Sequence, residues 1–249
     1  MGPASESGTG RTFFVADLHL TDVRPAATGR FFRFLDEDVA GADALYILGD
    51  LFEAWVGDDH DEAVARDTAR RLKALTDAGT PVYFMHGNRD FMLASRYAQR
   101  SGMTLLADPA RIDLYGVPTL LMHGDTLCSD DTAYQSFRRR VRHPLTLALL
   151  RRLPFSLRRR LARQARAGSE SAKADKPAAI MDVNETEVVR VLRAQRAGRL
   201  IHGHTHRPAR HAHAVDGHDC ERWVLPDWYA RWGYVVCDVA GCALKLESL

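Results

Sequence analysis

The chain is poor in cysteine, with four among 249 residues, and no two of them form a C-x-x-C pair. Thiolate metal motifs of that spacing are therefore excluded. With no sign of a disulfide framework, we expect free thiols in a reducing compartment that serve packing and carry no chemistry. They are Cys128, Cys220, Cys237 and Cys242.

Long apolar runs are also missing. Residues 1–10 are polar and lack the apolar stretch of a signal peptide, so we expect a disordered start and no secretory leader. No segment has the length to span a bilayer. The formal net charge is only +2, which does not suggest that the whole molecule binds polyanions. Hydrophobic residues at 46% and charged residues at 27% are typical of a globular protein, and the length fits one α/β domain with or without an inserted cap.

Five short apolar segments, rich in branched and aromatic residues, each give way to Gly, Asp, Asn or His. They predict five buried strands, and their nearly continuous apolar character predicts sheets that are covered on both faces. The segments are residues 12–17, 44–50, 81–88, 118–125 and 199–206.

Local patterns predict further elements between and after these strands. Residues 61–79 have apolar positions at helical spacing, and Asn184 with Glu187 resembles a capping box for a helix that stops at Gly198. Residues 233–247 predict a β-hairpin that turns near Ala240 and Gly241.

Residues 134–180 differ from the rest in composition. Eleven arginines alternate with leucines between Arg138 and Arg166, and Pro144 and Pro154 divide the stretch. We expect at least two basic amphipathic helices here, followed by a polar loop over 169–179. The predicted organisation is a core of residues 11–133 and 181–249 with residues 134–180 inserted as a cap.

Side chains suited to metal binding stand at or just after the ends of the five predicted strands. Ligands of open α/β sheets bind outside the carboxyl ends of the strands, and residues two apart in an extended segment share one side. Carboxylate, amide and imidazole groups suit Mn, Fe or Zn, and seven ligands are enough for two ions that share one carboxylate. The candidates are Asp17, His19, Asp50, Asn88, His123, His204 and His206.

Each of these motifs alone could be an ordinary turn, but five strand ends in succession are hard to attribute to chance. We interpret the remaining histidines, among them His86, His202, His211, His213 and His218, as structural or surface residues. A non-catalytic module that binds RNA or membranes through its arginines is the competing hypothesis. It is disfavoured because the arginines are not interleaved with aromatic residues for base stacking, and a binding module does not need the metal ligands.

The motifs DLH, GD, GN, HGD and GHTH, in this order across residues 17–206, resemble the calcineurin-like metallophosphoesterase family. The resemblance implies two packed mixed β-sheets flanked by helices. It implies one ion held by Asp17, His19, Asp50 and His206, and a second held by Asp50, Asn88, His123 and His204, with Asp50 bridging. Catalytic roles would fall to Asp17, Asp50, Asn88, Arg89 and His123.

The segment GNRDF departs from many members, which have His where this chain has Arg89. With DLHL, GDLFEAWVGDD, HGDTLCSDD, AIMDVN and LIHGHTHRP, it resembles the pyrophosphohydrolases that cleave UDP-2,3-diacylglucosamine in bacterial lipid A biosynthesis. That resemblance implies the products UMP and 2,3-diacylglucosamine 1-phosphate and two divalent ions, typically Mn²⁺. It implies substrate contacts by Asn88, Arg89, Asp131, Tyr134, Ser169, Lys173, Lys176 and His204. The chain departs from the pattern at Ala172, where a polar residue is common.

The basic cap is compatible with this substrate, because its leucines could contact acyl chains and its arginines the anionic inner-membrane surface. We therefore expect a peripheral protein at the cytoplasmic face, with no nucleic-acid partner and a monomer favoured. The alternative is a metal-dependent phosphodiesterase or pyrophosphatase that acts on a soluble nucleotide.

Overall fold

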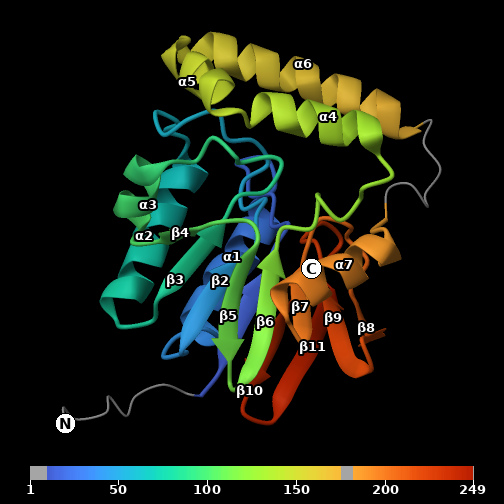
Figure 1. Cartoon of the computed structure of the whole chain (residues 1–249). Helices are drawn as coiled ribbons and strands as arrows, with labels where there is room; N and C mark the ends of the chain where they lie inside the picture. Colours follow the sequence, from blue (N-terminus) through green and yellow to red (C-terminus); the bar gives the residue numbers. More distant parts are fainter. Residues whose placement is uncertain (1–9, 175–181, 249) are drawn as a thin grey trace.

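The structure, a computed structural model, describes residues 10–174 and 182–248, and it gives only the backbone of residues 169–174 (Figure 1). The expected disorder of residues 1–9 and the expected substrate contact of Lys176 fall outside the described residues, as do the side chains of Ser169 and Lys173.

Two mixed sheets form the centre of the molecule. The first has the order β11-β10-β1-β2-β3-β4, in which β1 to β4 are parallel and β10 is antiparallel to both of its neighbours, β1 and β11. Its strands are β1 (Thr12–Val15), β2 (Ala44–Ile47), β3 (Val82–Met85), β4 (Thr104–Leu106), β10 (Arg231–Asp238) and β11 (Gly241–Ser248).

The second sheet has the order β5-β6-β7-β9-β8, with β6, β7 and β9 parallel and β5 and β8 antiparallel at the two edges. Its strands are β5 (Ala110–Leu114), β6 (Val117–Met122), β7 (Arg199–His202), β8 (Ala209–Val215) and β9 (His218–Val224).

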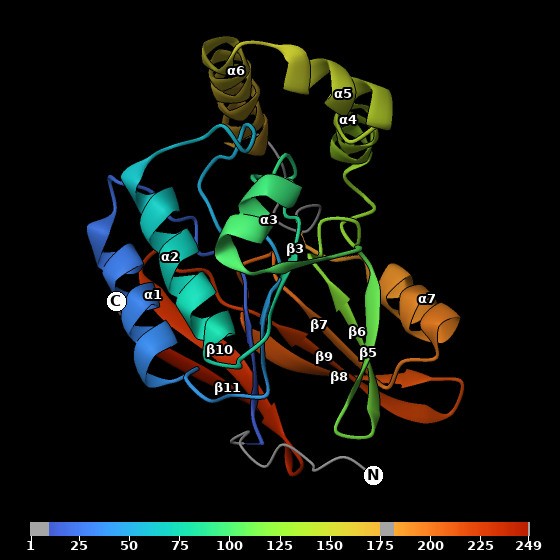
Figure 2. The ribbon, with the colours of Figure 1, turned by 90° about the vertical axis from the view of Figure 1, so that its left-hand side faces the viewer.

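Helices cover the outer faces of both sheets (Figure 2). Three of them, α1 (Pro25–Glu37), α2 (Ala63–Asp77) and α3 (Ser95–Ser101), pack on the first sheet in one apolar cluster. On the second sheet, α7 (Glu185–Gln195) forms a separate cluster. The arrangement is the expected pair of packed mixed sheets with flanking helices.

The two-sided burial of β1 shows why its sequence is apolar throughout. Phe13 and Val15 face the helices, whereas Phe14 lies between the sheets, in a cluster with Ile201 and Trp223 of the second sheet. Successive side chains of a strand point to opposite faces, so a strand between two covered faces needs apolar residues at every position.

The two helices and the hairpin predicted from local patterns are present, but one of the helices ends earlier than expected. The 61–79 pattern corresponds to α2, and the Asn184 side chain accepts hydrogen bonds from the backbone N–H groups of Thr186 and Glu187 as the N-cap of α7. The helix ends on Arg196 in the left-handed conformation (φ 47°), so the expected stop at Gly198 is wrong. The expected hairpin is β10 and β11.

The expectation of four free thiols is wrong for one pair. Cys237 and Cys242 form a disulfide, because the antiparallel register of β10 and β11 places them directly opposite each other. Cys128 and Cys220 form no disulfide and are buried, in agreement with a packing role.

Three helices follow β6 and lie across one end of both sheets (Figure 1): α4 (Thr132–Val141), α5 (Pro144–Arg152) and α6 (Phe155–Ala174). Both prolines stand at helix starts, where a missing N–H is tolerated. The prediction of a polar loop over 169–179 is wrong for residues 169–174, which belong to α6. Alanine, glutamate and lysine in this stretch favour a helix, and no proline interrupts it before Pro177. In the described part of the chain, no helix has the length and apolarity needed to cross a bilayer.

The core between the sheets should be sensitive to loss of volume. Phe14 is fully buried and stacks on Tyr46, with ring centroids 5.1 Å apart. We expect Phe14→Ala to lower the free energy of unfolding by about 3–5 kcal/mol, measured by urea denaturation. The control Val23→Ala removes an 83% exposed side chain and should change it by less than about 0.5 kcal/mol. A small effect at Phe14 would contradict this packing.

Candidate metal centre

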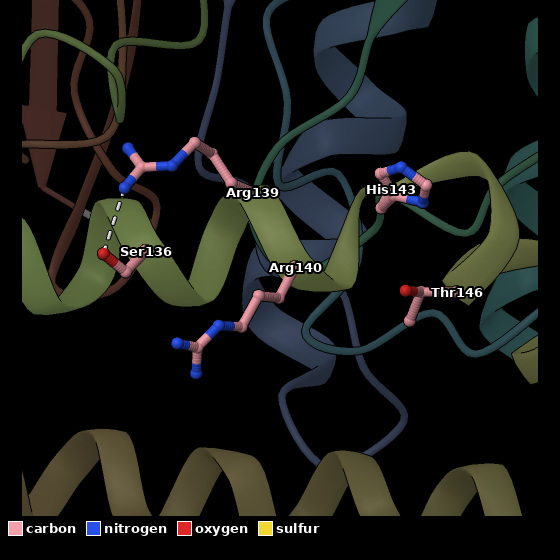
Figure 3. Close-up of a pocket in the computed structure, with 5 residues that line it drawn as sticks. All are labelled: Ser136, Arg139, Arg140, His143 and Thr146. Atoms are coloured by element: carbon pink, nitrogen blue, oxygen red, sulfur yellow. Dashed lines mark hydrogen bonds between the residues drawn. The ribbon is translucent and has the colours of Figure 1, made fainter.

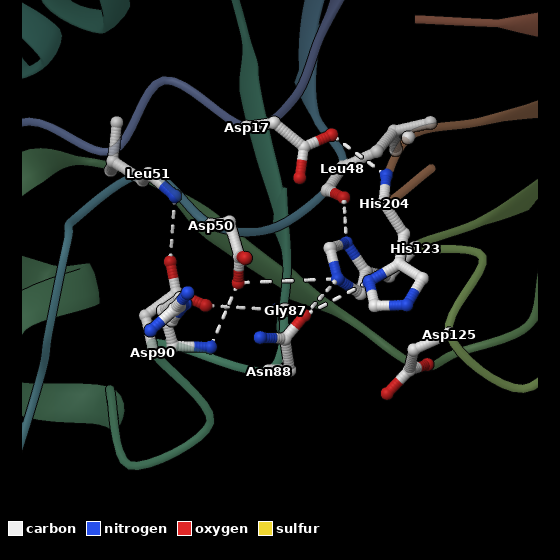
Figure 4. Close-up of polar contacts among 12 residues, drawn as sticks. Asp17, Leu48, Asp50, Leu51, Gly87, Asn88, Asp90, His123, Asp125 and His204 are labelled. Atoms are coloured by element: carbon white, nitrogen blue, oxygen red, sulfur yellow. Dashed lines mark hydrogen bonds and ion pairs between the residues drawn. The ribbon is translucent and has the colours of Figure 1, made fainter. Parts of the chain in front are cut away.

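All seven side chains predicted as metal ligands come together where strands of both sheets end (Figure 4 shows five of them). Asp17 and His19 follow β1, Asp50 follows β2 and Asn88 follows β3. The second sheet contributes His123 after β6, and His204 and His206 after β7. Three of the loops belong to neighbouring parallel strands, which is why their side chains meet at one edge.

One set of ligand atoms surrounds Asp17. The Nε2 atom of His206 lies 3.3 Å from Asp17 Oδ1, and Nε2 of His19 lies 3.9 Å from the same oxygen. The closest ligand atoms of these three residues all lie within 4.8 Å of one another, which is the spacing of a metal-binding group.

Asp50 lies between this set and a second one. Its Oδ2 atom is 3.8 Å from His19 Nε2, and its Oδ1 atom is 3.9 Å from His123 Nε2. Asn88 completes the second set, because its Oδ1 atom lies 3.0 Å from both His123 Nε2 and His204 Nδ1. The position of Asp50 is the one required of a carboxylate shared by two ions.

The backbone at the ligands is unusual. In the described chain eight non-glycine residues have positive φ, and five of them are predicted metal ligands. A side chain in this region costs free energy and persists only where the surrounding structure holds it. The five are Asp17 (φ 54°), His19 (φ 48°), Asp50 (φ 54°), His204 (φ 69°) and His206 (φ 56°).

Glycines in the motifs let the strand ends approach one another. A Cβ atom on Gly87 would lie 2.1 Å from Asp50 Oδ1, and one on Gly203 would lie 2.4 Å from Asp17 Oδ2. Both distances are too short for any side chain. The glycines of GN and GHTH are therefore required by the close packing of neighbouring loops against the carboxylates.

Two further carboxylates connect the loops that hold the predicted ligands. Asp90 accepts hydrogen bonds from the backbone N–H groups of Leu51 (2.7 Å) and Gly87 (2.8 Å), which joins the loops after β2 and β3. Asp125 accepts from the Tyr134 hydroxyl at 2.7 Å, and so ties α4 to the loop after β6. Groups of this kind orient metal ligands in other proteins.

The hydrogen bonds leave ligand atoms directed at the centre. The Nδ1 atom of His123 lies 2.8 Å from the carbonyl oxygen of Leu48, an acceptor that favours a proton on Nδ1, and Nε2 is directed at the centre. Asp17 Oδ1 and both ring nitrogens of His19 are buried and have no hydrogen-bond partner among the described residues. Buried acceptors without donors fit divalent cations.

Ionisation of the centre is strongly perturbed. Burial raises the pKa of Asp50 to about 7, against the opposing effect of His123. Burial disfavours charge on His123, but Asp50 and Asp125 outweigh it and raise the pKa of His123 to about 9. Excess negative charge is thus buried here, and a cation would compensate it.

The residues predicted to contact the substrate lie beside the metal centre, at the start of α4 and in the last turns of α6. The backbone N–H of Arg89 donates to Asp50 Oδ1 at 2.8 Å, so its side chain begins directly beside the centre. Tyr134 stacks on His204, with ring centroids 6.1 Å apart. Asp131 caps α4, where its side chain accepts the N–H of Tyr134 at 3.0 Å. Residue 169 and residue 173 lie in the last turns of α6, whose side chains are not described.

Sequence reasoning missed two acidic neighbours of the predicted ligands. Asp227 Oδ2 lies 3.5 Å from His206 Nδ1, and Glu53 Oε2 lies 3.9 Å from His19 Nδ1. Glu53 also pairs with Arg24 at 3.3 Å and with Arg166 of α6. Asp227 lies outside the quoted motifs, and Glu53 lies inside GDLFEAWVGDD without being one of the predicted ligands. Their proximity in the fold identifies both as neighbours of the ligands.

His202, the last residue of β7 and the one directly before the GHTH motif, has a structural environment. Its ring is fully buried, with Nδ1 2.8 Å from the Gly203 carbonyl oxygen and Nε2 3.4 Å from the Arg222 guanidinium. Burial, followed by the charge of Arg222, lowers the pKa of His202 to about 3. It is therefore a neutral core residue.

Known proteins share this sequence over most of its length. The UDP-2,3-diacylglucosamine hydrolase of Pseudomonas aeruginosa (strain UCBPP-PA14) is 51% identical over 235 residues, 94% of either chain. The hydrolases of the same name from Enterobacter sp. (strain 638) and Xanthomonas axonopodis pv. citri (strain 306) are both 48% identical. They cover 94% and 96% of this chain, and 97% and 99% of their own.

Among solved structures, the chain has a distant likeness to an archaeal phosphodiesterase, with 96% of this chain and 99% of that chain covered, a TM-score of 0.46 and 11% identity. The model of the calcineurin-like phosphoesterase family matches residues 10–208. That match covers well over half of the chain and includes every strand end of the centre, and the relatives confirm the resemblance seen in the motifs. This chain belongs to the calcineurin-like phosphoesterase family.

Proposed function

We propose that this chain is a metal-dependent hydrolase that cleaves the pyrophosphate bond of UDP-2,3-diacylglucosamine and releases UMP and 2,3-diacylglucosamine 1-phosphate. The convergence of six further predicted ligand side chains around Asp50 carries the proposal. The shared name of the relatives supports this substrate over a soluble nucleotide.

Two divalent ions, which we propose to be Mn²⁺, would lie on either side of Asp50. Asp17, His19 and His206 would complete one ligand set; Asn88, His123 and His204 would complete the other. When bound, such ions polarise phosphoryl oxygens and supply a nucleophilic water at neutral pH. The backbone strain and the glycine contacts support these sets, because both hold the ligands in place before any ion binds.

The remaining groups would bind and orient the diphosphate. Arg89 offers a planar guanidinium for bidentate contact with phosphate oxygens and for the charge that grows on them. The leaving group is itself a phosphate ester, so a general acid in this position is less needed, which explains an arginine in place of histidine. Tyr134 would face the sugar. Asp131, Ser169, Lys173 and Lys176 would complete the head-group contacts.

The inserted helices α4–α6 form the proposed cap over this site. Phe137, Leu145 and Leu149 are exposed on it, which supports contacts with acyl chains or lipid. We propose that the arginines of the cap hold the protein on the anionic cytoplasmic face of the inner membrane, as a peripheral protein.

The direct test of this function is release of UMP from UDP-2,3-diacylglucosamine, followed by chromatography, with and without Mn²⁺. We expect turnover that depends on Mn²⁺ and is far slower with UDP-N-acetylglucosamine, which lacks the acyl chains. Equal turnover of both compounds would favour the soluble-nucleotide alternative, and no turnover of either would contradict the proposal.

Replacement of the shared carboxylate should affect both ions. Asp50→Asn keeps the shape but removes the charge, so we expect fewer than two bound ions per chain and a loss in kcat/KM of more than about a hundredfold. Mass-spectrometric metal analysis and the UMP assay measure the two effects. Asp67→Asn, on the exposed surface of α2, is the control. Full activity with a normal metal content in Asp50→Asn would exclude the shared-ligand geometry.

Arg89 should act in the transition state. Arg89→Gln should lower kcat by about 10²–10³-fold, as the loss of one charge-stabilising donor does, with normal metal content. Arg89→Lys should recover only part of the loss, since lysine cannot form the bidentate contact. Arg70→Gln, a 73% exposed side chain on α2, is the matched control. If Arg89→Gln changed only KM, the proposed role would be wrong.

A further inference from the structure

The arginines of the cap fall into two groups. Residues 132–166 contain eleven arginines and no acidic residue. Four arginines pair with carboxylates of the core: Arg138 with Asp125 at 2.7 Å, Arg142 with Asp125 at 3.5 Å, Arg158 with Asp59, and Arg166 with Glu53. These four attach the cap to the rest of the molecule.

The other seven form no ion pair with any residue that the structure describes. Such a concentration of one charge repels itself and is unfavourable unless an external anion compensates it. The seven are Arg139, Arg140, Arg151, Arg152, Arg159, Arg160 and Arg163.

Two of these arginines border a hollow of about 370 Å³ where α4 meets α5 (Figure 3). Arg139 and Arg140 line it with Ser136, His143 and Thr146. Arg139 donates to the Ser136 hydroxyl at 3.0 Å, and Arg140 has no hydrogen bond to the other residues drawn. Guanidinium groups beside hydroxyls are donors of the kind that bind phosphate oxygens. No predicted metal ligand lines the hollow.

Exposed apolar side chains stand before and after the arginines of the hollow in the sequence. Phe137 precedes Arg139, and Leu145 and Leu149 follow His143; their exposed fractions are 48%, 75% and 61%. A soluble phosphate would not compensate for that exposed apolar area. An anionic lipid offers both a phosphate for the arginines and acyl chains for the leucines.

We propose that the hollow between α4 and α5 binds the phosphate of an anionic lipid headgroup, with Leu145 and Leu149 entering the acyl layer. The inference rests on the proposed membrane location and names the site responsible for it. Membrane attachment through this site would turn the α4–α5 side of the cap toward the bilayer.

Vesicle binding tests the site with a matched pair of variants. The full chain is sedimented with vesicles of phosphatidylcholine alone or with added phosphatidylglycerol. Arg139→Gln/Arg140→Gln removes the pocket arginines, and Arg151→Gln/Arg152→Gln removes the same charge elsewhere on the cap. Diffuse attraction should cost both variants about fivefold per arginine. We expect the pocket variant to lose at least tenfold more affinity than the control.

Two further arms identify the ligand. Leu145→Asn/Leu149→Asn should weaken binding while the melting temperature stays unchanged, because both side chains are exposed. Inorganic phosphate, at constant ionic strength, should compete only weakly with the vesicles, because it cannot replace the acyl contacts of Leu145 and Leu149. Equal losses in the two arginine variants, unaffected binding in the leucine variant, or complete displacement by phosphate at a concentration equal to that of the lipid headgroup would each overturn the proposal. None of these measurements needs substrate turnover, so they fail independently of the proposed hydrolysis.

Discussion

The interior of this molecule contains two carboxylates, Asp17 and Asp50, in contact with imidazoles where strands of both sheets end. Burial of charge is unfavourable unless opposite charge accompanies it. The raised pKa values of Asp50 and His123 indicate that the polypeptide alone compensates this charge only in part. The positive-φ backbone and the close glycine contacts hold these side chains together at the ends of the strands.

The cap and the centre are mechanically connected. Asp125 follows the strand that carries His123 and also binds Tyr134 and Arg138 of α4. Glu53 lies beside His19 and pairs with Arg166 of α6. Acids near the ligands thus hold the basic helices in place, while the remaining arginines stay available to an external anion. The same insert thus contacts acids near the centre and carries seven arginines that pair with no carboxylate of the described residues.

The sequence predicted the five strands that carry the ligands, because their apolar runs end in polar residues that packing alone does not require. It did not reveal the edge strands β5 and β8, whose exposed polar residues resemble a loop, although the Asp216-Gly217 turn is a hairpin signal. The Cys237–Cys242 disulfide depends on register between β10 and β11, which composition does not show. Asp227 and Glu53 become neighbours of the ligands only through tertiary packing.

Anomalous diffraction tests the shared-carboxylate geometry most directly. Crystals of the protein grown with Mn²⁺ should show two peaks at the manganese absorption edge, about 3.5–4 Å apart with Asp50 between them. One peak only, or two peaks that Asp50 does not join, would contradict the account.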